Sequence, residues 1–248
     1  MLKKERHAFI IQQLNIHNKV LSSDLSVQLN VSEDTVRRDL QELSEVGNLL
    51  KVHGGALSNS FHFTLQNNQI YSLTEKKSIA QKAASLITDG MFVLLSGGTT
   101  IRELVKTLPP NLNATFITVS IPIALELMNH PGSEVIFIGN KLLKSAQLAV
   151  GAEVVQRLGQ IRADICFLGT NSIDAEEGIT DLEWEVIEVK QAMIRASKKV
   201  VSLAISEKLN SVQRLKVCAI EEVDVLITEL DAEDERLKPY TNKNVEVL

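Results

Sequence analysis

The sequence feature that most constrains the fold is a ten-residue run, VSEDTVRRDL, at positions 31–40. Ser32 is a good helix N-cap, because its hydroxyl can accept from a backbone N–H that the helix leaves unpaired. Val36, Leu40 and Leu43 recur at spacings of four and three, which places them on one buried stripe. The polar residues on the remaining surface are Thr35, Arg37, Arg38 and Gln41. The run therefore predicts a capped helix that carries two adjacent arginines and a threonine on one exposed side.

Two interpretations of this outer side are open. Guanidinium groups beside short hydroxyl side chains suit phosphate oxygens and guanine edges in the major groove of DNA. A short basic run on a helix is, however, also typical of an ordinary solvated face. The segments before and after the run decide between these two interpretations.

The flanking segments predict a helix-turn-helix with a wing. Residues 3–16 carry an apolar side typical of a helix, and Ser22 is a candidate N-cap for a short second helix over residues 23–29. In the helix-turn-helix arrangement, the helix after such a turn enters the groove. Residues 49–52 are β-like and precede His53-Gly54-Gly55, which predicts a small β-wing. Lys51 and His53 can reach the DNA backbone from this wing, with an ordinary hairpin as the alternative.

The distribution of charge restricts how DNA would be bound. The chain has 248 residues and a formal net charge of −5, which argues against a protein that coats nucleic acid non-specifically. Residues 1–57 hold seven Lys or Arg and seven Asp or Glu, so this region is neutral and the remainder carries the whole excess. DNA binding is therefore expected to be local and site-specific.

The run VSEDTVRRDLQELSEVGNLLKVHGGAL, residues 31–57, resembles the N-terminal signature of DeoR-type bacterial transcriptional regulators. This resemblance implies a winged helix-turn-helix domain over residues 1–57 that binds a double-stranded DNA operator. It also implies which residues contact DNA, with the two wing residues as weaker candidates. These are Ser32, Thr35, Arg37, Arg38, Lys51 and His53. Asp39 is expected to pair with an arginine or to cap local structure, because phosphates repel a carboxylate.

The rest of the chain predicts a linker and an α/β domain. Residues 58–74 hold no charged residue and no sustained periodicity, which indicates an interdomain linker, and residues 75–248 form the larger domain. A helix is expected over residues 75–87. Apolar strands alternate with helical stretches, which predicts a largely parallel sheet. The expected strands are 91–95, 115–119, 135–138, 165–168, 199–204 and 223–227.

The first of these strands leads into a candidate anion site. Residues 96–100 read Ser-Gly-Gly-Thr-Thr, and a helix is expected over residues 101–108. Glycines let backbone N–H groups approach an oxyanion, and a helix N-terminus supplies positive potential. The spacing is neither a Walker loop nor a dinucleotide fingerprint, so a phosphate ester on a small molecule is the better expectation. A plain strand-to-helix turn is the alternative.

The DeoR resemblance extends over this larger domain. It implies a sugar-phosphate-sensing domain related in fold to ribose-5-phosphate isomerase, and therefore a phosphorylated sugar as effector. By position, Gly98, Thr99 and Thr100 would hold the phosphate, Lys208 would supply charge, and Glu185 and Lys190 would supply polar groups. Gly97 and Ser120 complete the expected effector-binding set. For Glu185 and Lys190, an exposed pair of charges on a helix is the alternative.

Three positions depart from the usual family pattern. Ser96 and Ile205 stand where an aspartate is common, and Val119 stands where an asparagine is common. Losing such acceptors removes hydrogen bonds to sugar hydroxyls while leaving the phosphate loop intact. An atypical effector, or an altered response to it, is therefore expected.

Three classes of function remain at this point. The first is a DNA-binding repressor, a dimer or higher homo-oligomer whose operator affinity depends on its effector. The second is a sugar-phosphate isomerase, for which Glu185 is the candidate base. The third is a protein-interaction module.

The composition adds several expected absences. Neither the five histidines nor Cys166 and Cys218 show metal-ligand spacing, and no cofactor is expected. No apolar run reaches the roughly 18 residues of a membrane span. The expectation is a cytoplasmic protein without a metal site.

Overall fold

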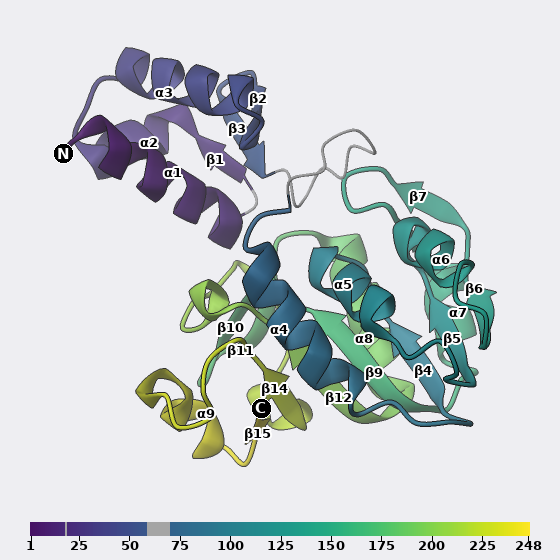
Figure 1. Ribbon diagram of the computed structural model, residues 1–248. Coiled ribbons are helices and arrows are strands. Elements are labelled where there is room, and N and C mark those ends of the chain that lie inside the picture. The colour runs from purple at the N-terminus through teal and green to yellow at the C-terminus, as the bar shows by residue number, and fades with distance from the viewer. Residues whose placement is uncertain (18, 59–69) are drawn as a thin grey trace. The chain divides into compact units, whose positions relative to one another are not determined.

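The computed structural model describes residues 1–17, 19–58 and 70–248, and it divides the chain into two compact units (Figure 1). The first unit is Met1–Tyr71 and the second is Ser72–Leu248. Most of the predicted linker, residues 59–69, lies outside the described residues.

The first unit combines three helices with a small antiparallel sheet. Its elements in order are α1 (Lys3–His17), β1 (Lys19–Leu21), α2 (Ser22–Leu29), α3 (Glu33–Glu45), β2 (Leu49–Val52) and β3 (Gly55–Ser58). The sheet order is β1-β3-β2, and β2 and β3 form the predicted wing around the turn at His53-Gly54. Asn30 makes the turn between α2 and α3 in a left-handed conformation, with φ of 51°.

One strand of this unit was not predicted, and one prediction is wrong. Residues 19–21 form β1, which adds a third strand to the wing sheet. Ser22 does not cap α2: Leu21 occupies the N-cap position without a side-chain hydrogen bond, and Ser22 is the buried first residue of the helix. A three-residue strand carries too little periodicity to be found from sequence.

The core of the first unit explains why α3 has its orientation. The predicted stripe of Val36, Leu40 and Leu43 is buried, as expected. It packs in one cluster with residues from the other elements of the unit, namely Ile10, Leu14, Val20, Leu25, Leu29, Leu49 and Ala56. Because α1, α2 and the wing all contribute, the opposite side of α3 is left facing outward.

The second unit is built on a seven-stranded parallel sheet. Its order is β15-β14-β12-β9-β4-β5-β6, and every neighbouring pair in it is parallel. The bounds are β4 (Phe92–Leu95), β5 (Ala114–Thr118), β6 (Ser133–Phe137), β9 (Ala163–Gly169), β12 (Ser197–Leu203), β14 (Val225–Ile227) and β15 (Glu246–Val247). The predicted parallel sheet is thus confirmed.

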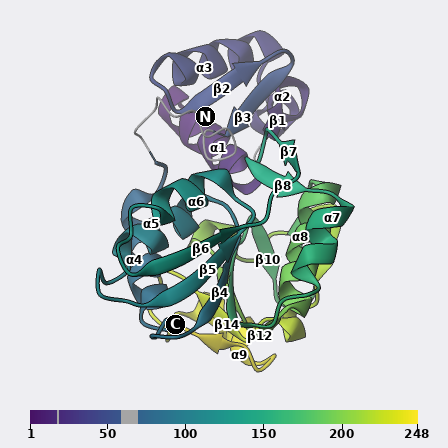
Figure 2. The ribbon, with the colours of Figure 1, turned by 90° about the vertical axis from the view of Figure 1, so that its right-hand side faces the viewer.

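Helices cover both faces of this sheet. Helices α4 (Leu73–Ala84), α5 (Thr99–Thr107) and α6 (Ile121–Leu127) lie on one side, and α7 (Ala152–Leu158) and α8 (Trp184–Arg195) lie on the other (Figure 2). The four-residue α9 (Lys238–Thr241) precedes β15. The chain runs from β4 outward to β6 and then returns to β9 on the other side of β4. This reversal makes the carboxyl ends of β4 and β9 the topological switch point, where ligands bind in such sheets.

Two smaller antiparallel sheets were not predicted. Strands β7 (Lys141–Leu143) and β8 (Leu148–Val150) form a hairpin. Strands β10 (Ser172–Asp174), β11 (Gly178–Asp181) and β13 (Leu215–Cys218) form a three-stranded sheet. Short 3-10 turns, η1 (Ser206–Lys208), η2 (Ile220–Glu222) and η3 (Glu235–Leu237), complete the unit.

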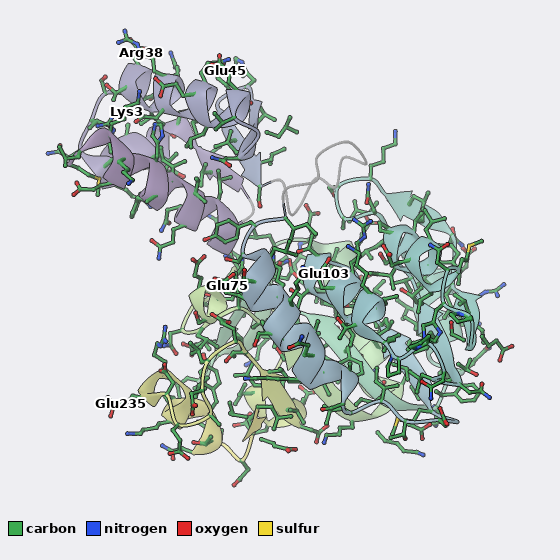
Figure 3. The ribbon with its side chains drawn as sticks, in the orientation of Figure 1. Lys3, Arg38, Glu45, Glu75, Glu103 and Glu235 are labelled. Atoms are coloured by element: carbon green, nitrogen blue, oxygen red, sulfur yellow. The ribbon has the colours of Figure 1, made fainter. Side chains whose placement is uncertain are left out.

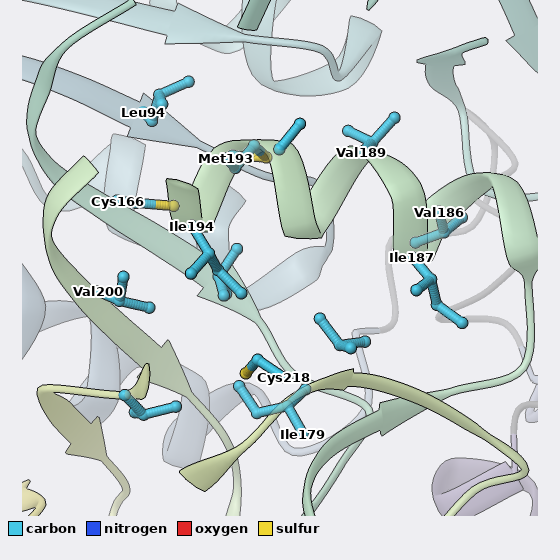
Figure 4. Packing of buried hydrophobic residues seen from close by; sticks show 14 of the residues in the cluster. Leu94, Cys166, Ile179, Val186, Ile187, Val189, Met193, Ile194, Val200 and Cys218 are labelled. Atoms are coloured by element: carbon cyan, nitrogen blue, oxygen red, sulfur yellow. The ribbon is translucent and has the colours of Figure 1, made fainter. Parts of the chain in front are cut away.

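The two cysteines lie in the main core of the second unit. Figure 4 shows Cys166 and Cys218 among apolar side chains such as Met193 and Ile194. Burial raises the pKa of the Cys166 thiol to about 12 and that of Cys218 to about 11. Both thiols are therefore protonated at neutral pH and act as small apolar core groups.

Candidate DNA-reading helix and effector site

The start of α3 is fixed by Ser32. Its hydroxyl accepts a hydrogen bond from the backbone N–H of Thr35 at 3.3 Å, and the two hydroxyls lie 3.0 Å apart. Glu33 and Asp34 follow in the first turn, where the positive helix end stabilises carboxylates. The predicted N-cap is therefore confirmed, and Thr35 is tied to it.

The two adjacent arginines have different surroundings. Arg37 binds carboxylates of its own helix, with 3.0 Å to Glu33 and 3.4 Å to Asp34. Within the described ranges, Arg38 forms no ion pair, and Figure 3 shows its side chain on the outer side of α3. Among the described residues, Arg38 is therefore the arginine of α3 without a carboxylate partner.

Asp39 holds α3 against α1. Its carboxylate accepts from Arg6 at 2.8 and 3.1 Å, and His7 lies 3.1 Å from it. Burial by itself would raise the pKa of the Asp39 carboxyl, but the hydrogen bonds from Arg6 and His7 outweigh burial and lower it. The expectation that Asp39 pairs with an arginine is confirmed, and the arginine comes from α1.

The wing is connected to the same helix. Lys51 of β2 donates to the side-chain oxygen of Gln41 on α3 at 2.8 Å. His53 is exposed at the turn of the wing. Both predicted wing residues thus lie on the surface, and one of them touches α3 directly.

The Gly-rich loop of the second unit leads directly into a helix. Gly98 occupies the N-cap position of α5 with φ of 114°, which favours glycine, and α5 begins at Thr99 rather than at residue 101. Thr99 and Thr100 therefore stand in the first turn, and both are buried. The free N–H groups and positive potential expected for anion binding belong to these residues.

Hydrogen bonds draw three strand ends together around this loop. The Ser96 hydroxyl accepts from the backbone N–H of Gly169 at 2.8 Å, which joins the ends of β4 and β9. The Thr118 hydroxyl donates to the Leu95 carbonyl at 2.8 Å, which joins β4 to β5. A Cβ built on Gly97 would lie 3.4 Å from the Ser120 hydroxyl oxygen. The predicted residues Gly97, Gly98, Thr99, Thr100 and Ser120 are therefore gathered at the switch point.

Glu185 and Lys190 do not form a pair, although both lie on α8. Lys190 is buried and binds Asp181 of β11 at 2.8 Å, and Asn171 donates to the same carboxylate oxygen at 3.3 Å. Burial opposes ionisation of Asp181, but the Lys190 ammonium outweighs it and lowers the pKa of that carboxyl. Glu185 instead binds Lys141 of β7 near the surface, at 2.9 Å. The two predicted residues thus have separate surroundings.

Lys208 lies in η1 and is buried. Burial lowers the pKa of Lys208 to about 7, and the charge of Lys76 of α4, which is also buried, acts in the same direction. Lys76 is not among the site residues predicted from the sequence. A signal was present, because Lys76 precedes the buried Ile79, Ala80 and Ala83 by three, four and seven residues and so belongs to their stripe.

Two absences apply to the described part of the chain. No cluster of three or more His, Cys, Asp or Glu side chains there is arranged to hold a metal ion. No helix in residues 1–17, 19–58 and 70–248 is long and apolar enough to cross a membrane.

A helix-turn-helix with a β-wing, whose third helix exposes two adjacent arginines, is the arrangement of winged DNA-binding domains. Residues 6–61 match the model of the DeoR-like helix-turn-helix domain, and residues 72–230 match that of the DeoR C terminal sensor domain. The chain belongs to the DeoR family of transcriptional regulators.

Curated relatives match along nearly the whole chain. The HTH-type transcriptional repressor GlcR of Bacillus subtilis is 34% identical and covers 92% of this chain and 89% of its own length. The HTH-type transcriptional regulator GolR of Listeria innocua is 32% identical over 92% of this chain and 91% of its own. The HTH-type transcriptional regulator GlpR of Haloferax volcanii is 31% identical over 94% and 93%.

Among solved structures, similarity is more remote. The structure of ribose 5-phosphate isomerase A from Methanocaldococcus jannaschii has a TM-score of 0.39 and 17% identity, and it covers 54% of this chain and 53% of its own. The whole-length relatives are regulators with a helix-turn-helix domain. The chain is accordingly a DNA-binding transcriptional regulator and not an isomerase.

Proposed function

We propose that the protein represses a carbohydrate-utilisation operon and that a phosphorylated sugar bound in the second unit controls its operator affinity. The observation that carries the effector class is the group of Gly98, Thr99 and Thr100 at the start of α5, in a unit that also buries Lys208. Helix N–H groups, hydroxyls and a buried ammonium together suit a phosphate better than a neutral sugar.

The residues proposed to contact the operator lie on α3 and the wing. Arg38 is the leading candidate, because it projects outward without a carboxylate partner in the described ranges. Ser32, Thr35, Arg37, Lys51 and His53 complete the proposed DNA-contacting set. A protein of this kind acts where the chromosome lies, which in bacteria and archaea is the cytoplasm.

The effector contacts are proposed for a set of residues in the second unit, five of which lie at the switch point. These are Gly97, Gly98, Thr99, Thr100, Ser120, Glu185, Lys190 and Lys208. Lys190 is included because it forms a buried ion pair with Asp181. The other carboxylate oxygen of Asp181 accepts a hydrogen bond from the backbone N–H of Leu182 at 2.8 Å. Glu185 contributes at most from the rim, since it is bound to Lys141.

A homo-oligomer is the proposed active form. One α3 helix covers only one half-site, and dimers of helix-turn-helix proteins place two such helices about 34 Å, or one duplex turn, apart. A neutral first unit gains little from non-specific attraction to phosphates, so two linked half-sites are the more effective route to affinity.

The effector class is tested by ligand-dependent stabilisation of the full chain. Thermal unfolding is followed with a panel of pentose and hexose phosphates and with the same sugars lacking phosphate. A ligand at 100 times its dissociation constant stabilises by about 2.7 kcal/mol. We expect stabilisation by at least one sugar phosphate and by none of the free sugars. Stabilisation by a free sugar as strong as by its phosphate would contradict the proposal.

A further inference from the structure

The seven-stranded sheet of the second unit ends in two different edges. At one edge, β15 is only two residues long, whereas at the other β6 runs over five residues and pairs, within the described part of the chain, with β5 alone. Natural sheets protect a long edge with Lys, Pro or a β-bulge. The sequence of β6, Ser-Glu-Val-Ile-Phe, contains neither residue, and its register with β5 is unbroken. Strand β6 is therefore an unprotected edge.

Apolar side chains are exposed along this edge. Ile136 and Phe137 of β6 are 39% and 42% exposed, and Leu125 of α6 and its C-cap residue Met128 are 52% and 73% exposed. Helix α6 packs against β6, and the two elements lie together at the right-hand side of the second unit in Figure 1. Exposed apolar residues that gather on neighbouring elements are typical of an interaction surface.

The backbone of β6 offers hydrogen-bonding groups along its open side. The N–H of Ile138, which directly follows β6, donates to the Thr118 carbonyl of β5 at 2.9 Å. Backbone groups point to alternate sides of a strand from one residue to the next. The N–H and C=O groups of Ser133, Val135 and Phe137 therefore point away from β5. A strand that pairs with this edge must supply acceptors and donors at the same spacing.

A second copy of β6 meets this requirement in an antiparallel arrangement about a two-fold axis. With the axis at Val135, the two Val135 residues exchange both of their backbone hydrogen bonds. Ser133 of each copy then pairs with Phe137 of the other, so every outward backbone group of β6 gains a partner. Because each copy uses its one long edge, the pairing closes at two chains.

The charges near this edge also permit such pairing. In the same register, Glu134 of each copy lies opposite Ile136 of the other, so the two Glu134 carboxylates do not face each other. Residues 121–137 contain no Lys or Arg and one further carboxylate, Glu126, which binds Arg102 at 2.7 Å. The edge is thus complementary to itself in hydrogen bonding and without repulsion between like charges.

We propose that two copies of the chain associate by antiparallel pairing of β6 with β6, flanked by the exposed apolar residues of α6. One continuous sheet then runs through the second units of both copies. The proposal rests on the proposed function, to which it adds the surface that forms the homo-oligomer. This surface belongs entirely to the second unit, so it uses neither α3 nor the wing.

A cysteine on the two-fold axis tests the register. The hydrogen-bonded pair at Val135 places two Cα atoms about 5.5 Å apart, which a disulfide can bridge. Val135→Cys in the full chain should therefore form a covalent dimer under mild oxidation, detected on a non-reducing gel. Ile136→Cys is the matched control, since its two copies would be diagonal neighbours about 7–8 Å apart, too far for a disulfide. The native Cys166 and Cys218 are buried and should not cross-link.

A charge at Ile136 tests the same register without a covalent bond. Ile136→Glu places a carboxylate opposite each Glu134, whereas Ile136→Lys places an ammonium there. By sedimentation equilibrium of the full chain, we expect the dimer dissociation constant to rise at least ~10-fold in Ile136→Glu and clearly less in Ile136→Lys. Val212→Glu changes an exposed apolar residue outside α6 and β6 and should leave this constant unchanged.

The outcomes separate this inference from the proposed function. If the wild type is a dimer but Val135→Cys forms no cross-link, the β6 pairing falls and the proposed homo-oligomer stands. The same holds if Ile136→Glu and Ile136→Lys weaken the dimer equally, or if Val212→Glu weakens it as much as Ile136→Glu. A wild type that sediments as a monomer at every concentration would overturn both the pairing and the homo-oligomer.

Discussion

Arg37 and Arg38 are adjacent in sequence, yet their charges are not equally available to DNA. The carboxylates of Glu33 and Asp34 already neutralise Arg37, whereas Arg38 has no ion pair in the described ranges. We expect Arg38→Ala to weaken operator binding by about 1–3 kcal/mol and Arg37→Ala to weaken it less. Fluorescence anisotropy with labelled operator DNA measures both. A loss for Arg37→Ala equal to or larger than that for Arg38→Ala would contradict this assignment.

Asp39 gives the first unit a specific response to acid. Its pKa is lowered in the folded state, so its contact with Arg6 and His7 stabilises the fold fully above its unfolded pKa of about 3.9. That stabilisation is lost as the pH falls through the lower folded value. Denaturant unfolding at pH 7 and at pH 3 should therefore show a larger difference in wild type than in Asp39→Asn. The same pH dependence in both proteins would show that the contact does not stabilise the unit.

At the scale of elements, the start of α3 serves both stability and recognition. Ser32→Ala removes the acceptor for the Thr35 N–H and should lower the free energy of unfolding of the first unit by ~1 kcal/mol. Ser32→Asp keeps an N-cap acceptor, so it should preserve stability while placing a negative charge near DNA phosphates. Chemical unfolding and operator binding together separate the two effects. Unchanged operator affinity in Ser32→Asp would place this residue away from DNA.

The junction of β4, α5 and β9 depends on a close approach of two backbones. A Cβ built on Gly169 would lie 2.5 Å from the Gly97 carbonyl oxygen, so Gly169→Ala must displace the loop. A Cβ on Gly97 would meet the end of the Leu148 side chain at 2.6 Å, which can move more easily. We expect Gly169→Ala to abolish effector-dependent stabilisation and Gly97→Ala to reduce it. The reverse order would contradict this description of the loop.

The elements also show what could be predicted from this sequence. The N-cap at Ser32, the buried stripe of α3, the wing and the parallel strands followed from spacing, because each has a periodicity of its own. The start of α5 at Thr99 could not be predicted from spacing, because it depends on the positive φ of Gly98. Strand β1, the β7–β8 hairpin and the β10–β11–β13 sheet are short and gain their stability from partners distant in sequence.

The same distinction applies to the site. The Gly-Gly-Thr-Thr loop is contiguous, so its residues were found together. The partners of the charged residues come from separate elements: Asp181 for Lys190 and Lys141 for Glu185. These pairs could not be predicted from sequence spacing, because the two residues of each pair come close only in the folded unit.

At the scale of the whole molecule, the chain has two units of different architecture. The first unit presents α3 and a wing, and the second gathers glycines and threonines at the switch point of its sheet. A ligand shifts operator affinity only if it binds the DNA-competent and DNA-free forms differently, typically by 5- to 150-fold in regulators of this kind. The coupling must therefore be measured on the full chain.

The most direct measurement is operator affinity of the full-length protein with and without a bound effector. Anisotropy titrations use the DNA upstream of its own operon, at fixed moderate salt, with a sugar phosphate that stabilises the protein and with the corresponding free sugar. We predict specific binding that weakens at least ~5-fold with the sugar phosphate and is unchanged by the free sugar. Specific binding that is the same with and without every stabilising sugar phosphate would contradict it.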